Sequence, residues 1–213
     1  MKRIILITAG LIFLLSSLSF AGEPTNQLKA NIDNILKVLS NKALKSDAKK
    51  VERRNQLRKV VNERFDFAEM AQRSLAANWV KRTPKEKKEF VKIFSDLLEK
   101  SYIDKVESYQ DEKINYTSES IDGNYAVVKT KIVTKNNEIP IDYKMLKNAK
   151  GWMVYDVVIE NVSLVNNYRS QFNKIISASS YNNLVKKMKA KLEGDESSGI
   201  TEPVKTKGKS KKK

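Results

Sequence analysis

The spacing of apolar residues changes abruptly near residue 110 and changes back near residue 163. Before the first change, apolar side chains recur every three or four residues, as Phe90, Phe94 and Leu97 do, which is the pattern of a helix with one buried face. Between the two changes they alternate with polar residues, which is the pattern of strands with one buried face. Helices and strands that are segregated in this way predict an α+β fold with an antiparallel sheet.

The helical parts carry recognisable start signals. The clearest is Thr83-Pro84-Lys85-Glu86, where a threonine cap, a proline at the first helical position and a glutamate three residues after the cap form a capping box. Ser46 is a second predicted cap, and the apolar residues of its helix, Val51 among them, are expected to face inward. The predicted helices span residues 24–41, 46–65, 66–82 and 83–109 and, after the strands, 164–177 and 181–192.

Four alternating segments predict an antiparallel meander of four strands, with turns at Asp122-Gly123, Asn136-Asn137 and Lys150-Gly151. The last of these segments is apolar on both faces, as expected if helices cover one side of the sheet and another element covers the other. We therefore predict one α+β domain over residues 22–194. It would be mainly helical in 22–110, form a four-stranded sheet of the NTF2-like kind in 111–162 and be helical in 163–194, with a disordered lysine-rich tail at 195–213.

The N-terminus has the pattern of a secretory signal peptide. Lys2 and Arg3 precede an apolar run that ends at Leu15, and small residues at Ser19 and Ala21 suit cleavage after Ala21. The run is short for a membrane span, so an uncleaved anchor is the less favoured alternative. We expect residues 1–21 to be removed and the protein to be exported.

The residues needed for many kinds of catalysis are missing from the chain. It contains no histidine and no cysteine, which excludes a Ser-His dyad, a cysteine nucleophile and almost any zinc site. None of its seven glycines forms a phosphate-binding loop. We therefore expect no enzyme, no metal and no cofactor, although a hydrolase that uses two carboxylates is disfavoured rather than excluded.

The formal net charge of +16 leaves two kinds of partner open. Nucleic acid is the usual partner of so basic a chain, but export argues against it. Six lysines lie in the last nine residues, KTKGKSKKK, and could guide an exported protein to anionic membrane surfaces or acidic proteins. A polyanion-binding exported protein that acts through this tail is therefore one alternative, and a solubilising tail is another.

Four segments resemble, in order and spacing, the MlaC family, also called the toluene-tolerance auxiliary family: FDFAEMAQRSLAANW, EFVKIFSDLLEKSY, IPIDYKML and GWMVYDVVIENVSLVNNYRSQF. The most specific part is W-x-V-Y-D-V-x-I-E-x-V-S-L-x-x-N-Y-R-x-x-F, from Trp152 to Phe172. The family commonly has glycine at the positions of Ala76 and Asn161.

The resemblance implies a periplasmic phospholipid carrier that passes lipid between an outer-membrane lipoprotein complex and an inner-membrane ABC transporter complex, and so serves outer-membrane lipid asymmetry. It also implies a monomer that contacts membrane surfaces transiently and has phospholipid as its ligand.

A carrier of this kind must hide the acyl chains of its lipid from water. About 30 methylenes at about 0.8 kcal/mol each cost roughly 24 kcal/mol to keep exposed. We expect a cavity between helices and sheet, although plain core is the alternative role of each residue. The candidate lining residues are Phe65, Phe67, Met70, Phe94, Leu97, Ala126, Val128, Ile141, Tyr143, Met145, Met153, Tyr168 and Phe172.

The segment from Ser163 to Ile176 combines two aromatic residues with an arginine. Tyr168 and Phe172 are four residues apart on a predicted helix, so they share a face, which we expect to lie on the sheet. Arg169 points about 100° away from that face. It has two candidate roles, of which the first is favoured: binding a carboxylate such as Asp156 or Glu160, or binding a lipid phosphate.

Overall fold

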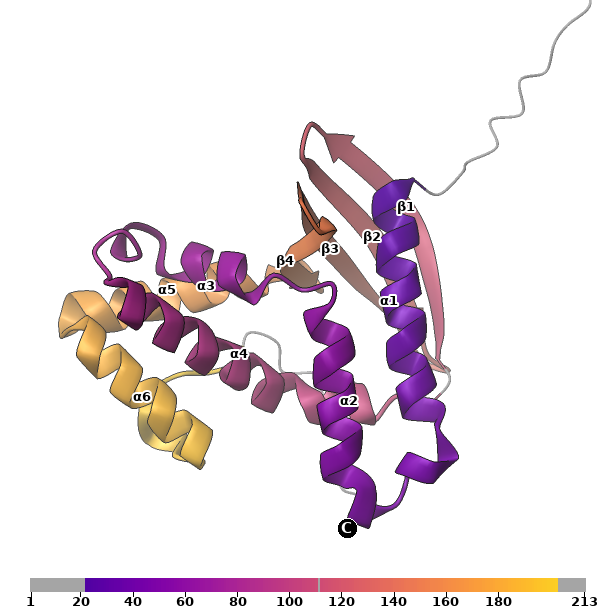
Figure 1. The fold of residues 1–213 in the computed structure, drawn as a ribbon, viewed down its shortest axis with the longest axis horizontal. Coiled ribbons are helices and arrows are strands. Elements are labelled where there is room, and N and C mark those ends of the chain that lie inside the picture. Colours follow the sequence, from indigo (N-terminus) through magenta and orange to yellow (C-terminus); the bar gives the residue numbers. More distant parts are fainter. Residues whose placement is uncertain (1–21, 111, 203–213) are drawn as a thin grey trace, which may run out of the picture.

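The computed structural model describes residues 22–110 and 112–202 of the 213-residue chain, in which an antiparallel sheet is packed against helices (Figure 1). The helices are α1 (Glu23–Ser40), η1 (Lys42–Leu44), η2 (Asp47–Lys49), α2 (Lys50–Asn62), α3 (Phe67–Leu75), η3 (Ala76–Asn78), α4 (Pro84–Glu107), α5 (Leu164–Ala178), α6 (Tyr181–Glu193) and η4 (Glu196–Ser198). The strands are β1 (Lys113–Asp122), β2 (Tyr125–Val133), β3 (Glu138–Asn148), β4 (Gly151–Ile159) and β5 (Val162–Ser163).

The predicted α+β class is confirmed, and the sheet has the strand order β1-β2-β3-β4-β5. It has five strands rather than the four predicted, because the two residues of β5 turn back to pair with Val158 and Ile159. A strand of two residues is too short to show an alternating pattern. The NTF2-like comparison stays a prediction, and the predicted signal peptide at 1–21 lies outside the described residues.

Helix α1 lies across one face of the sheet, which is called the inner face below (Figure 1). Leu28 and Ile32 are buried against the sheet. The carboxylate of Glu119 on β1 accepts hydrogen bonds from the backbone N–H of Thr25 at 2.7 Å and from its hydroxyl at 2.5 Å. A negative charge at the first turn of a helix is favourable because the helix dipole is positive there. Glu119 therefore fixes the start of α1 on the sheet.

Helices α3, α4, α5 and α6 form a second body beside the sheet (Figure 1). The predicted capping box of α4 is confirmed: the Thr83 hydroxyl accepts from the backbone N–H of Glu86, whose carboxylate accepts from the backbone N–H of Thr83. Phe90, Phe94 and Leu97 of this helix are fully buried, as the apolar stripe predicted. The stripe of α4 is the centre of this helical body.

Helix α2 is held against α4 mainly by ion pairs. Leu57 is its one buried residue. Arg53 and Arg54 both bind the carboxylate of Glu107, with nitrogen–oxygen distances of 2.8 and 2.6 Å, and Arg58 binds Glu99 at 2.6 Å. The prediction that Val51 faces inward is wrong, since its side chain is 73% exposed at the first turn of the helix.

The two positions at which the family commonly has glycine both have positive φ angles. Ala76 has φ 46° and Asn161 has φ 67°. Asparagine tolerates this left-handed region, whereas alanine is strained there because of its Cβ. Ala76 is the residue at which α3 ends, so the strain lies in the turn between α3 and η3.

We expect the substitution Ala76→Gly to stabilise the fold by about 1 kcal/mol, because it relieves this backbone strain. Urea denaturation of the two proteins measures the change. Ala77→Gly is the matched control, and its effect is expected to be a loss of about 0.5 kcal/mol. A less stable Ala76→Gly variant would show that the turn is not strained.

Part of the predicted tail belongs to the fold. The boundary at residue 195 is wrong, because Ser198 and Ile200 are buried and Ile200 packs in the helical body. The sequence GDESSG has the composition of a linker, and a single isoleucine after it is too weak a signal of burial. Residues 203–213, which include the six lysines of the tail, lie outside the described residues.

The connection between α2 and α3 runs along the free edge of β4. The backbone N–H of Val154 donates to the carbonyl of Arg64, and the backbone N–H of Asp66 donates to the carbonyl of Val154, both at 2.8 Å. This single parallel bridge and the short strand β5 cover two stretches of the same edge.

Candidate functional site

The buried apolar residues form two clusters. The first, called the helical cluster below, is built from α3, α4, α5 and α6 and includes Phe94 and Tyr168. The second, called the sheet cluster below, lies between the inner face of the sheet and α1 and includes Val128 and Met145. Tyr102 of α4 packs against both clusters. The apolar interior is therefore divided, and the boundary lies between the helical body and the sheet.

The predicted lining residues are distributed over both clusters. Met70, Phe94, Leu97, Tyr168 and Phe172 belong to the helical cluster, and Phe67 packs against it. Ala126, Val128 and Met145 belong to the sheet cluster, with Phe65, Ile141 and Tyr143 packed against it. Met153 is buried but lies in neither. The rings of Phe65 and Phe67 are 6.3 Å apart, so this pair connects the two groups.

The expectation that Tyr168 and Phe172 face the sheet is wrong. Their rings instead pack edge-on against Phe94 of α4, with ring centroids 5.5 and 5.9 Å apart. The helical period predicted correctly that the two aromatic residues share a face, but it does not identify the element that the face contacts.

The inner face of the sheet is covered unevenly. Registered pairs such as Ala126 with Met145 lie under α1 and are buried. Towards the other end of the same strands, Thr130 is still buried, but its partner Ile141 is only half-buried. The open end of the sheet is the name used below for five half-buried residues that pack against the sheet cluster: Ile114, Tyr116, Ile141, Tyr143 and Ile159.

Three tyrosine hydroxyls are buried and have no hydrogen-bond partner among the described residues: those of Tyr102, Tyr116 and Tyr168. Burial raises the pKa of each of them, that of Tyr168 to about 12. Ser101 lies beside the Tyr168 hydroxyl without completing a hydrogen bond to it. An unsatisfied buried hydroxyl costs roughly 1–3 kcal/mol unless water or a ligand meets it.

Sequence analysis did not identify Tyr102 or Tyr116 as site residues. Tyr102 continues the apolar stripe of α4, and Tyr116 occupies an inward position in β1. The sequence did contain a signal for both residues, namely a tyrosine at a position that the pattern predicts to be buried. Such a residue brings a hydroxyl into an apolar interior.

Arg169 does not bind either of the predicted carboxylates. Its Nε donates to the backbone carbonyl of Arg73 at 3.0 Å, so it connects α5 to the last turn of α3. A cation at the C-terminal end of a helix is favourable because free carbonyls gather there. The predicted carboxylate partner of Arg169 is therefore wrong. Contact with a phosphate stays a prediction.

Asp156 instead organises the start of α5. Its carboxylate accepts hydrogen bonds from the hydroxyl of Ser163 at 2.6 Å and from the backbone N–H of Val165 at 3.1 Å. The ammonium of Lys144 lies 3.3 Å from it. Ser163 caps the helix by accepting from the backbone N–H of Asn166. The motif from Trp152 to Phe172 thus joins the last long strand to α5 through a buried carboxylate.

Two surface pockets lie away from the predicted lining residues. One follows the outer side of α2, around the exposed Val51. The other lies between α5, α6 and the segment after α6, and is lined by Gln171, Lys187 and Thr201 among others. In the described ranges, no group of three or more Asp or Glu residues could hold a metal ion, and no helix is long and apolar enough to cross a membrane.

Comparison with known proteins identifies relatives. The sequence profile of the family described as MlaC protein matches residues 29–190. A curated relative, the intermembrane phospholipid transport system binding protein MlaC of Haemophilus influenzae, is 29% identical over 127 residues, which are 56% of this chain and 59% of the relative. The matched part therefore spans less than two thirds of that relative.

A solved structure has the same fold. It is a phospholipid-binding protein from Ralstonia solanacearum in complex with a phospholipid, with a TM-score of 0.73 and 21% sequence identity. The likeness covers 81% of this chain and 98% of that chain. It supports the arrangement of helices around an antiparallel sheet described above.

Proposed function

Because the chain belongs to the MlaC family, we propose that it is a periplasmic phospholipid carrier. In this proposal the protein shelters the acyl chains of a phospholipid and carries the lipid between an outer-membrane lipoprotein complex and an inner-membrane ABC transporter complex. The proposal includes no catalytic step. The names of the Haemophilus relative and the Ralstonia neighbour support phospholipid as the ligand.

The open end of the sheet is the observation that carries the proposal. Its isoleucines and tyrosines face the same side as the sheet cluster, yet they are only half-buried. A soluble protein gains about 25 cal/mol for each Å² of such apolar surface that it removes from water. Acyl chains laid along these side chains would bury that surface and their own methylenes together.

Room for the acyl chains is proposed at the boundary between the two clusters. Contacts across it include the pair Phe65–Phe67 and the ring of Tyr102. The arginines of α2 reach α4 through long, flexible side chains. Helix α2 can therefore shift relative to α4 without breaking up an apolar core. Movement of the sheet and the α1–α2 pair away from the helical body would open a space lined by residues of both clusters.

The proposal is tested by extracting the purified mature protein with chloroform and methanol and identifying the lipids by mass spectrometry. We expect about one phospholipid per chain, because the acyl chains are costly to expose to water. The same extraction of protein that was first washed with detergent is the control and should yield none.

A protein that carries no lipid, and takes none up from vesicles, would contradict the carrier proposal. Tight retention on heparin in that case would favour the polyanion-binding alternative.

A further inference from the structure

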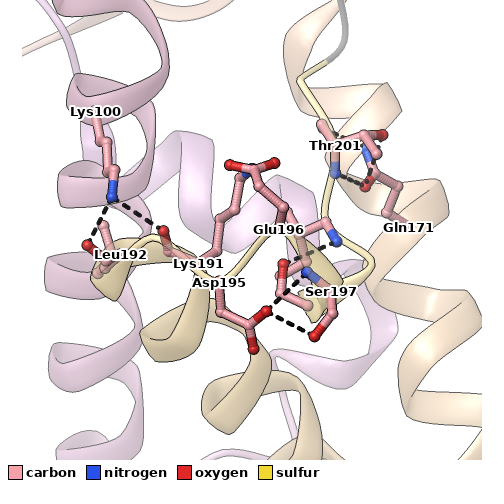
Figure 2. A network of polar contacts seen from close by, with 10 residues as sticks. Lys100, Gln171, Lys191, Leu192, Asp195, Glu196, Ser197 and Thr201 are labelled. Atoms are coloured by element: carbon pink, nitrogen blue, oxygen red, sulfur yellow. Dashed lines mark hydrogen bonds and ion pairs between the residues drawn. The ribbon is translucent and has the colours of Figure 1, made fainter.

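The chain folds back on itself after α6. Residues 194–202, called the C-terminal hook below, run from the end of α6 to the flank of α4 and α5, as Figure 2 shows for part of the segment. The hook lies beyond residue 190, where the match to the family profile ends. The role of the hook must therefore be inferred from the contacts that it makes in this chain.

Polar contacts hold the hook in a defined path. Gln171 of α5 accepts from the backbone N–H of Thr201 at 2.8 Å and donates to its carbonyl at 3.0 Å (Figure 2). Lys187 of α6 donates to the carbonyl of Ser198 at 2.8 Å. At the start of the hook, Asp195 accepts from the backbone and hydroxyl of Ser197. These contacts place the residues that follow Ser198.

The end of the hook inserts an apolar side chain and then an anion. Ile200 is 2% exposed and belongs to the helical cluster. Two residues later, the carboxylate of Glu202 binds the ammonium of Lys105 at 2.9 Å. That ammonium also lies over the ring of Tyr102, 4.7 Å from its centroid. An apolar group followed by a negative charge is also the chemical order of an acyl chain and its phosphate.

One of the unpartnered hydroxyls belongs to the ring on which this ammonium lies, that of Tyr102. The Tyr168 side chain is fully buried and the Tyr102 side chain half-buried, and neither hydroxyl has a hydrogen-bond partner among the described residues. Burial and, to a smaller extent, the negative charge of Glu202 raise the pKa of both tyrosines, although neither hydroxyl donates to its carboxylate. The ammonium that holds Glu202 therefore lies on the ring of a tyrosine whose O–H donor is unused among the described residues.

We propose that Lys105 and Tyr102 form a binding site for the phosphate of a phospholipid, and that Glu202 of the C-terminal hook occupies this site when no lipid is bound. This inference rests on the proposed carrier function and adds the place of the headgroup phosphate and an internal competitor. Tyrosine hydroxyls and an ammonium all donate hydrogen bonds to phosphate oxygens, and phosphate offers more acceptors than the single carboxylate that it displaces.

Displacement of the Glu202 carboxylate alone requires little energy. The side chains of Lys105 and Glu202 are 32% and 36% exposed, and ion pairs of that exposure are weak. The carboxylate can therefore yield to a phosphate while still filling the site in the empty protein. Its competition lowers the apparent lipid affinity by the fraction of time that it occupies the site.

The test measures binding of dioctanoyl-phosphatidylglycerol to delipidated mature protein by calorimetry. Glu202→Gln should raise the affinity roughly two- to fivefold, because the competing charge is removed. Lys105→Met keeps the apolar stem but removes the ammonium, and should lower the affinity about tenfold. Glu196→Gln is the matched control, since Glu196 lies in the same hook but pairs with Lys191, and should change nothing.

Two further ligands identify the group that is recognised. Dioctanoylglycerol lacks the phosphate, so its affinity should be the same for wild type and Glu202→Gln. Inorganic phosphate alone should bind far more weakly than the lipid. An equal gain for dioctanoylglycerol, or phosphate binding as tight as that of the lipid, would overturn the assignment.

Hydrogen exchange gives a readout that does not depend on any variant. Phosphatidylglycerol should speed exchange at the backbone amide of Thr201 in the wild-type protein, because loss of the Glu202 contact loosens the end of the hook. Unchanged exchange, together with unchanged affinity in Glu202→Gln, would reject the hook as competitor while leaving the carrier proposal intact. Failure of the wild type to bind either lipid would instead reject the carrier proposal itself.

Discussion

Replacing Ile141 by tryptophan is expected to lower the affinity for phospholipid roughly tenfold while the fold survives. Ile141 lies at the open end of the sheet and is half-buried, so a larger ring can extend over the inner face without displacing packed neighbours. If the tryptophan ring displaces two methylenes of an acyl chain from the sheet, the lost burial costs about 1.6 kcal/mol, which is close to a factor of ten in affinity. Lipid content after purification and binding of a fluorescent phospholipid measure the effect.

Two other tryptophan variants make this result specific. Val133 is near the same end of the sheet but points to the opposite face, so Val133→Trp should bind lipid normally. Val128 is fully buried under α1, and Val128→Trp should destabilise the fold by about 1–3 kcal/mol through overpacking. Equal loss of lipid in Val133→Trp, or none in Ile141→Trp, would show that the acyl chains do not lie along the inner face.

Replacing Asp156 by alanine is expected to reduce the free energy of unfolding by about 3 kcal/mol, because it removes two hydrogen bonds to a carboxylate and leaves one of their donors buried without an acceptor. The donors are the Ser163 hydroxyl and the Val165 backbone N–H, both at the start of α5. Asp156 itself is 3% exposed, so water cannot easily replace it. Chemical denaturation followed by circular dichroism measures the change.

The control for Asp156 is Asp142, a half-exposed carboxylate on the neighbouring strand β3. Asp142→Ala should change stability by less than about 0.5 kcal/mol, as surface substitutions generally do. A loss of similar size in both variants would mean that the connection from β4 to α5 does not depend on the buried carboxylate.

Local patterns predicted the elements of this fold well where the cause of the structure is itself local. The capping box at Thr83 determines where α4 begins, and alternation from Tyr125 to Val133 reflects one buried face of β2. The pair Tyr168 and Phe172 shows the limit. Their spacing places them on one face, but whether that face meets the sheet or α4 depends on the direction in which the chain leaves β5.

The burial of the candidate lining residues was predictable for the same reason, and their contact with lipid stays a prediction. Apolar residues such as Met70 and Val128 are buried as their patterns require, yet the division into two clusters is a property of the packing of whole elements. The hook was not predicted because Ile200 is its one buried apolar residue, which is too weak a signal in the sequence. The contacts of the hook to Gln171 and Lys105 also join residues that are far apart in the chain. Arg169 was assigned the wrong partner because a backbone carbonyl leaves no trace in a sequence.

The bridge between residues 64–66 and β4 also bears on how the protein avoids association with itself. An uncovered strand edge offers unpaired N–H and C=O groups to another chain, and it is a common starting point for aggregation. Here the parallel bridge at Val154 and the short strand β5 occupy the edge of β4, while a bulge near Thr117 interrupts the opposite edge on β1. Neither edge of the sheet therefore offers another chain a long regular row of free hydrogen-bonding groups, which disfavours edge-to-edge pairing between copies of the protein.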